Sequence, residues 1–199
     1  MKVTTQMVKE LREATGAGVL EAKKALEAVE GNFDKAVDIL REKGAARAAK
    51  RSGREATEGV IEVYEHPGSR LGVILELNCE TDFVARNEEF QALAHNLALQ
   101  IAAMNPQYIR VEDVPTEEIE HEAEILRKQA LAEGKPPEIA DKIVSGRIGK
   151  YYQEVCLLEQ PYVRDDGLTI QDLITETIRK TGENIIVRRF SRYELGESL

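Results

Sequence analysis

The sequence is poor in cysteine, with two in 199 residues. Cys79 and Cys156 lie far apart and have neither a CxxC pattern nor the cysteine–histidine spacing of a zinc site. A disulfide framework is therefore excluded, and the chain fits a reducing compartment. Because the first residues lack an apolar signal core and no apolar run is long enough to span a bilayer, we expect a cytoplasmic protein without a membrane partner.

Residues for metal binding and catalysis are also scarce. His66, His95 and His121 are scattered over a predicted turn and two predicted helices, without a second histidine at metal spacing. Gly149-Lys150 is not a P-loop, since that motif needs four residues between its glycines and a serine or threonine after the lysine. No nucleophile elbow or cysteine–histidine signature is present. We predict no metal, no cofactor and no covalent chemistry.

Positive charge is in deficit, with 27 lysines and arginines against 36 acidic residues, which gives a formal net charge of -9. Phosphate contact needs a broad basic surface, so the chain as a whole is not expected to bind nucleic acid. The exception is the segment 41–54, which has six basic residues and one glutamate. This segment is either a solvated surface or a docking site, and an RNA-binding role for it would show strong salt dependence.

The first 44 residues show three apolar stripes with helical spacing. The stripes are at 3–14, 19–29 and 33–40, and Gly16, Gly31 and Gly44 are expected to end the three helices. Val19 begins the second stripe. Such short helices are stable only if their stripes share one core, so residues 1–44 are predicted to form a three-helix domain. The length and the glycine-containing first turn resemble the ubiquitin-associated fold. Residues 45–54 are predicted to be a partly helical basic linker.

Residues 55–199 are predicted to form an α+β core domain. Apolar residues alternate over 59–64 and 71–77 around a turn at 66–69, which predicts a β-hairpin. Helices are expected over 88–104, from Thr116 to Gly134, from Pro137 with a break near Gly146 and Gly149, and over 170–180. Residues 184–190 complete a three-stranded antiparallel sheet covered by helices.

The segment 77–87 connects the second strand of the hairpin to the next helix. It contains Thr81, Asp82, Phe83 and Val84 between two rigid elements, where side chains are often aimed at a partner. The residues alone leave two alternatives open: Asp82 bonds nearby backbone N–H groups within a turn, and Phe83 belongs to the core.

Three collinear segments resemble the translation elongation factor Ts family, whose members exchange guanine nucleotide on bacterial elongation factor Tu. The segments are 11–26, which contains Thr15-Gly16-Ala17-Gly18, then 77–87, and finally 156–163, which contains Gln160-Pro161-Tyr162-Val163. The resemblance covers nearly the whole chain.

The resemblance implies an N-terminal domain that contacts the GTP-binding domain of elongation factor Tu. It also implies that Thr81, Asp82, Phe83 and Val84 approach the partner's magnesium site, so that GDP leaves and GTP enters. Arg86 and Asn87 belong to the motif and are expected to shape and cap the turn. One core unit without sustained heptads resembles the short form of the family, which has no inserted coiled coil and associates as a homodimer; residues 185–190 or the Cys156 segment are candidates for the interface.

The alternative function is a ubiquitin-associated-type adaptor. Such a protein would bind through residues 1–44 alone, and Asp82 and Phe83 would be dispensable. An enzyme would instead turn over a small substrate without any GTPase present, and the sequence nominates no such substrate.

Overall fold

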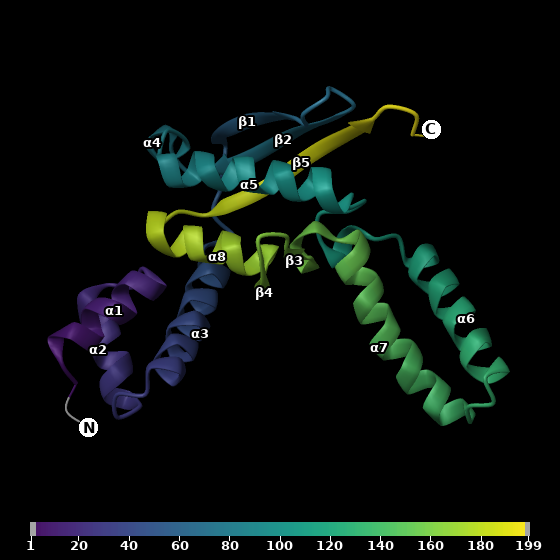
Figure 1. Ribbon diagram of the computed structural model, residues 1–199, viewed down its shortest axis with the longest axis horizontal. Helices are drawn as coiled ribbons and strands as arrows, with labels where there is room; N and C mark the ends of the chain where they lie inside the picture. Colours follow the sequence, from purple (N-terminus) through teal and green to yellow (C-terminus); the bar gives the residue numbers. More distant parts are fainter. Residues whose placement is uncertain (1–2, 198–199) are drawn as a thin grey trace. The chain divides into compact units, whose positions relative to one another are not determined.

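The computed structural model describes residues 3–197, apart from the side chain of Ala45 (Figure 1). The chain divides into two compact units. The first contains the residues up to Ile61, Glu76–Ala94 and Asp172–Arg188, and the second contains Glu62–Leu75, His95–Gln171 and the residues from Arg189 onward. The α+β class is confirmed.

Three helices open the chain: α1 (Thr5–Thr15), α2 (Val19–Ala28) and α3 (Phe33–Arg51). The Thr4 hydroxyl caps α1 by accepting from the Met7 backbone N–H at 3.2 Å, and Gly16 ends α1 in the left-handed conformation with φ 61°. The three helices share one core, whose buried residues are Val8, Leu11, Ala17, Ala22, Ala25, Leu26, Ala36 and Leu40. The boundary of a separate domain at residue 44 stays a prediction.

Two expectations for these helices were wrong. Helix α3 does not end at Gly44 but continues to Arg51. Several alanines follow Gly44, and the cost of one interior glycine, about 1 kcal/mol, is too small to stop them. A Cβ at Gly44 would lie 3.5 Å from Cδ of Arg179, an ordinary contact distance, so packing does not require glycine there. Val19 is 58% exposed, because α2 makes its buried contacts through Ala22, Ala25 and Leu26.

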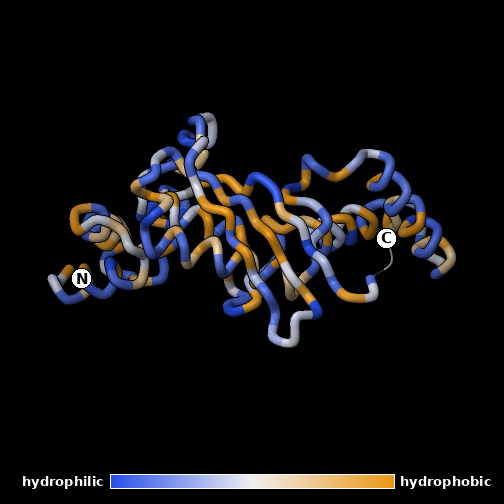
Figure 2. The backbone as a smooth tube through the Cα atoms, turned by 90° about the horizontal axis from the view of Figure 1, so that it is seen from above, coloured by the Kyte–Doolittle hydropathy of each residue, from blue (hydrophilic) through white to orange (hydrophobic). Residues whose placement is uncertain are grey.

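The sheet consists of β1 (Glu58–Glu65), β2 (Leu71–Cys79) and β5 (Ile185–Glu194), in the order β1-β2-β5. The predicted hairpin and third strand are therefore confirmed, and every strand contributes residues to both units. Hydrophobic residues recur along these strands (Figure 2). In β2, Val73, Leu75, Leu77 and Cys79 are buried in strict alternation, which is the pattern of a strand with one covered face.

Helices and two short strands complete the chain. They are α4 (Asp82–Ala85), α5 (Glu88–Met104), α6 (Thr116–Ala132), α7 (Pro137–Val155), β3 (Pro161–Tyr162), β4 (Asp165–Thr169) and α8 (Ile170–Thr181), with 3-10 turns at Val111–Asp113 and Leu157–Glu159. Helix α5 runs along one face of the sheet (Figure 1). The β3-β4 pair was not predicted, because strands of two and five residues have too short a pattern to recognise.

A buried pair of glutamines holds β3 to α5 in the second unit. Gln100 and Gln160 are both 0% exposed. The Gln100 side chain donates to Oε1 of Gln160 and to the carbonyl of Pro161, each at 3.1 Å, and accepts from the Val163 N–H at 2.9 Å. Buried amides of this kind are retained because each donor and acceptor has a partner. They explain two polar residues inside an otherwise apolar core.

Helices α6 and α7 lie antiparallel and side by side (Figure 1). The expected break in α7 at Gly146 and Gly149 was wrong, since the helix is continuous through both. Because the sequence lacks sustained heptads, no inserted coiled coil was expected. Helices α6 and α7 nevertheless pack against each other as a helical hairpin. Small and apolar residues are buried on it, namely Leu126, Ala130 and Ala140.

Replacing Gly146 and Gly149 by alanine is expected to stabilise α7. A Cβ at either position meets no atom within 4 Å. Alanine is favoured over glycine in a helix interior by up to about 1 kcal/mol per site, so the double variant should raise the free energy of unfolding by roughly 1–2 kcal/mol. Urea unfolding followed by far-UV circular dichroism measures it. An unchanged or lowered stability would contradict the continuous helix.

Glu118 anchors the start of this hairpin. Its carboxylate accepts a hydrogen bond from the Tyr108 hydroxyl at 2.6 Å and another from the Tyr151 hydroxyl. These hydrogen bonds, that from Tyr108 first, lower the pKa of Glu118 below its ordinary value of 4.5. Burial and the Glu118 carboxylate raise the pKa of Tyr151. Both phenols therefore remain hydrogen-bond donors at neutral pH.

The anchor is expected to weaken in acid. The pKa of Glu118 is lower in the folded than in the unfolded protein, so its stabilisation is present above 4.5 and is lost as the pH falls through the folded pKa. The difference in unfolding free energy between the unaltered protein and Glu118→Gln should therefore be constant near neutrality and shrink below that value. Urea titrations at pH 7, 5, 4 and 3.5 measure the difference, and one that stays constant throughout would contradict this role.

Candidate functional site

The candidate site is a single helical turn between β2 and α5. Thr81 has extended backbone angles, φ -131° and ψ 154°, and its hydroxyl oxygen accepts from the Val84 N–H at 3.4 Å. This is the geometry of a helix N-cap, so the chain turns into α4 directly after the strand. Ala85 is buried and fixes the turn to the core. The sequence had predicted a connector here, without a helical turn.

Phe83 points into solvent, with 81% of its surface exposed. The alternative in which Phe83 belongs to the core is therefore wrong. A large apolar side chain this exposed has no folded-state role visible among residues 3–197, and exposed aromatic residues are common in protein interfaces. The turn is held by other residues, so its fold does not depend on burial of Phe83.

Asp82 and Arg86 form an ion pair across the turn, with 2.8 Å between Oδ2 and Nη2. Their side chains are 45% and 77% exposed, and such surface pairs typically contribute about 0–1 kcal/mol. The backbone donor within the turn is taken by Thr81 rather than by Asp82. The Asp82 carboxylate can therefore leave Arg86 for another partner at little cost.

Asn87 begins the next helix. Its side-chain Oδ1 accepts from the Glu89 N–H at 2.7 Å and its carbonyl accepts from the Gln91 N–H at 3.0 Å. Asn87 thus occupies the N-cap position of α5. Helix α4 is thus capped by Thr81 at its start and is followed, after Arg86, by the capped start of α5.

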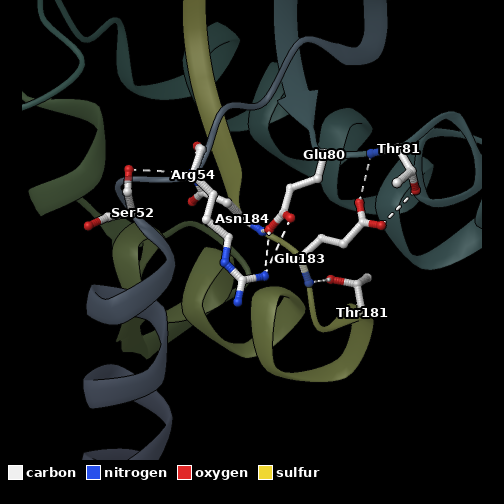
Figure 3. Close-up of polar contacts among 7 residues, drawn as sticks. All are labelled: Ser52, Arg54, Glu80, Thr81, Thr181, Glu183 and Asn184. Carbon is white, nitrogen blue, oxygen red and sulfur yellow. Dashed lines mark hydrogen bonds and ion pairs between the residues drawn. The ribbon is translucent and has the colours of Figure 1, made fainter.

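A second connector, between α8 and β5, supports the turn. The Glu183 carboxylate accepts from the Thr81 N–H at 3.0 Å and from the Thr81 hydroxyl at 2.6 Å (Figure 3). Glu183 itself is placed by α8, since its N–H donates to the Thr181 hydroxyl. Both connectors belong to the first unit.

Glu80 makes the reciprocal contact. Its carboxylate accepts from the Asn184 N–H at 2.6 Å and pairs with Arg54 at 3.4 Å (Figure 3). The Asn184 side chain donates in turn to the carbonyls of Arg54 and Ser52, at 2.9 and 3.5 Å. The residues just after α3, the turn and the α8–β5 connector are thereby joined in one network.

Sequence reasoning missed Glu80, Glu183 and Asn184. Thr81 and Glu183 are 102 positions apart, and no local pattern relates them. The available signal was indirect: both pairs of residues stand at the end of predicted elements, Glu80-Thr81 after a strand and Glu183-Asn184 after a helix.

The two cysteines are buried, free thiols. Cys79 donates to the Thr81 carbonyl at 3.1 Å. Burial, with the nearby Glu183 carboxylate, raises the pKa of Cys79 to about 11. Burial, with Glu159, raises the pKa of Cys156 to about 11. Because the thiolate is the reactive form, neither is suited to nucleophilic or redox chemistry at neutral pH.

Metal-binding and membrane-spanning features were sought in residues 3–197. This part of the chain has no group of three or more histidine, cysteine, aspartate or glutamate side chains placed to hold a metal ion. Its helices are all too short or too polar to cross a bilayer.

Comparisons with known proteins agree with the motif segments. The family model described as Elongation factor TS matches residues 1–197. The elongation factor Ts of Carboxydothermus hydrogenoformans is 58% identical over 99% of this chain and 91% of its own length. That of Desulfitobacterium hafniense is 60% identical over 100% of this chain and 91% of its own. The chain therefore belongs to the elongation factor Ts family.

Proposed function

We propose that this protein accelerates the release of GDP from elongation factor Tu, and that the turn 81–84 is the part that acts on the nucleotide site. The exchange role follows from family membership. The exposure of Phe83, at 81%, is the observation that supports the turn as the acting part. The cytoplasmic location stays a prediction.

Phe83 supplies the apolar part of the proposed contact. Burial of a phenylalanine side chain in a pocket of the partner is worth roughly 1.5–3 kcal/mol. This energy is available only where the partner has opened a pocket, so it favours the open, nucleotide-poor state. The side chain needs no rearrangement of its own fold to enter, because it already projects from a capped turn.

Asp82 supplies the charged part. Magnesium on a bound nucleotide is held by few protein oxygens together with phosphates and waters, so a carboxylate that draws on those waters or their supporting backbone weakens the ion. The Asp82 side chain is 45% exposed, and its carboxylate forms a surface ion pair with Arg86. It therefore combines negative charge with freedom to move.

Thermodynamic linkage turns this contact into exchange. Suppose that this protein binds the open state of elongation factor Tu more tightly than the closed state. Linkage then requires the two ligands to weaken each other equally: the protein lowers the affinity for nucleotide by the same ratio by which nucleotide lowers the affinity for the protein. GDP leaves, GTP enters, and the factor is displaced. No covalent step is required.

The test times the release of labelled GDP from purified elongation factor Tu with and without this protein. Release should be faster with the protein and should increase with its concentration until it saturates. Equal release in both samples would contradict the exchange function, and binding without acceleration would favour the adaptor alternative.

We also propose that two copies associate through the sheet face opposite α5. In the second unit, Val63, Ile74 and Tyr193 are 67%, 48% and 70% exposed and come from all three strands. Next to Ile74, Val73 and Leu75 are buried, so Ile74 faces away from the core. Exposed apolar side chains on neighbouring strands are typical of an interface. Sedimentation should give a dimer for the unaltered chain and a monomer for Val63→Lys; a monomeric unaltered chain would contradict this.

A further inference from the structure

Two connectors far apart in the sequence exchange matching hydrogen bonds at the base of the turn. Each contributes a glutamate followed by a residue whose backbone N–H is bound: Glu80 binds the Asn184 N–H, and Glu183 binds the Thr81 N–H (Figure 3). Hydrogen bonds to an ionised carboxylate are stronger than those between neutral groups. The connectors are therefore clamped in both directions.

We propose that Glu183 is a positioning residue for Phe83, a role that rests on the proposed exchange function. It acts through the hydroxyl of Thr81. That hydroxyl has one proton, which it donates to Oε1 of Glu183 at 2.6 Å, and so a lone pair is left facing the Val84 N–H. Glu183 thus selects the Thr81 rotamer that caps α4.

Loss of the Glu183 carboxylate releases the turn while the core stays intact. In Glu183→Gln only one side-chain oxygen remains, so the Thr81 N–H and the Thr81 hydroxyl no longer both have an acceptor, and the hydroxyl can rotate among its staggered wells. Asp82 and Phe83 follow Thr81 directly and depend on this cap for their direction. The buried anchor Ala85 and the strand β2 do not depend on it.

Glu183→Gln is the first variant to test, in the full chain. Stimulated GDP release from elongation factor Tu should fall by about tenfold at subsaturating concentration, a loss expected for a charge-assisted hydrogen bond. The matched control is Glu120→Gln, which removes the same charge from an exposed site on α6 and should remain within about twofold of the unaltered chain.

A fluorescence measurement separates positioning from general stability. The sequence contains no tryptophan, so Phe83→Trp introduces a single tryptophan at the turn, which can be excited apart from the six tyrosines. Adding Glu183→Gln to this variant should lower the time-resolved anisotropy of the tryptophan through faster local motion, while the melting temperature of the protein changes little. Adding Glu120→Gln should leave the anisotropy unchanged. Reduced exchange with unchanged anisotropy would overturn the positioning role.

Substitutions of Thr81 test the same hydrogen bond through its donor. They also keep the proposal testable if Glu183→Gln does not fold. Thr81→Ser keeps the hydroxyl and should exchange within about twofold of the unaltered chain, whereas Thr81→Val should lose about as much as Glu183→Gln. In the double variant the losses should not add. Additive losses would overturn the proposal.

Phe83→Ala distinguishes failure of the turn's proposed role in exchange from failure of the positioning role of Glu183. If it releases GDP as fast as the unaltered chain, the proposed role of the turn fails. If it is slow while Glu183→Gln is normal, only the positioning role of Glu183 fails.

Discussion

Replacement of Phe83 by alanine is expected to slow factor-stimulated GDP release by about tenfold to a hundredfold at subsaturating concentration, which corresponds to the loss of roughly 1.5–3 kcal/mol of apolar burial in the partner. Because Phe83 is 81% exposed, the isolated protein should keep its stability. The measurement is the dissociation of fluorescently labelled GDP from elongation factor Tu, with urea unfolding of the variant alongside.

The matched control for Phe83→Ala is Leu195→Ala. Leu195 is another large apolar side chain that is mostly exposed, at 65%, and it lies outside the turn. Its replacement should leave the exchange rate unchanged. Phe83→Leu should retain part of the activity, because leucine keeps much of the apolar area. Normal exchange by a well-folded Phe83→Ala would refute the proposed burial of Phe83 in a pocket of the partner.

The largest loss of stability is expected at Gly59. This residue lies in β1 with φ 152°, and a Cβ there would be 2.1 Å from the Leu77 carbonyl oxygen and 2.8 Å from Cα of Asn78. Both atoms belong to the backbone of β2, so no side-chain rotation relieves the overlap. Gly59→Ala must push β1 away from β2 and should lower the free energy of unfolding by roughly 3–5 kcal/mol.

Gly72→Ala is the control within the same hairpin. A Cβ at Gly72 would lie 3.8 Å from the Tyr64 carbonyl oxygen, an ordinary contact distance. It should change the free energy of unfolding by no more than about 1 kcal/mol. Urea titrations of both variants give the comparison, and a Gly59→Ala variant as stable as Gly72→Ala would contradict the close packing of β1 against β2 at Gly59.

Elements with a long, regular pattern were predictable from the sequence. Helix α5 begins and ends where its spacing indicated, because one apolar face continues over 17 residues and Asn87 and Asn105 flank it. Glycines were less informative. Gly16 ends a helix, whereas Gly44 and Gly146 lie inside one, and only the three-dimensional surroundings distinguish these uses.

The turn was located from the sequence, but its support was not. Alternation in β2 and the start of α5 placed residues 81–84 on a connector, and the family motif implied that Phe83 faces a partner. Glu183 could not be predicted, since a hydrogen bond between residues 102 positions apart has no periodic signal. The side chains that aim a site often come from elsewhere in the chain.

The separation of Thr81 from Glu183 has a consequence for synthesis on the ribosome. At roughly 5–20 residues per second, the three N-terminal helices emerge and can pack seconds before the α8–β5 connector exists. Strand β5, which pairs with the central strand β2, comes last among the strands of residues 3–197. A nascent chain stopped before residue 183 would carry the entire Thr81–Val84 motif without its clamp. The contact between Thr81 and Glu183 can thus form only after residue 183 has left the exit tunnel.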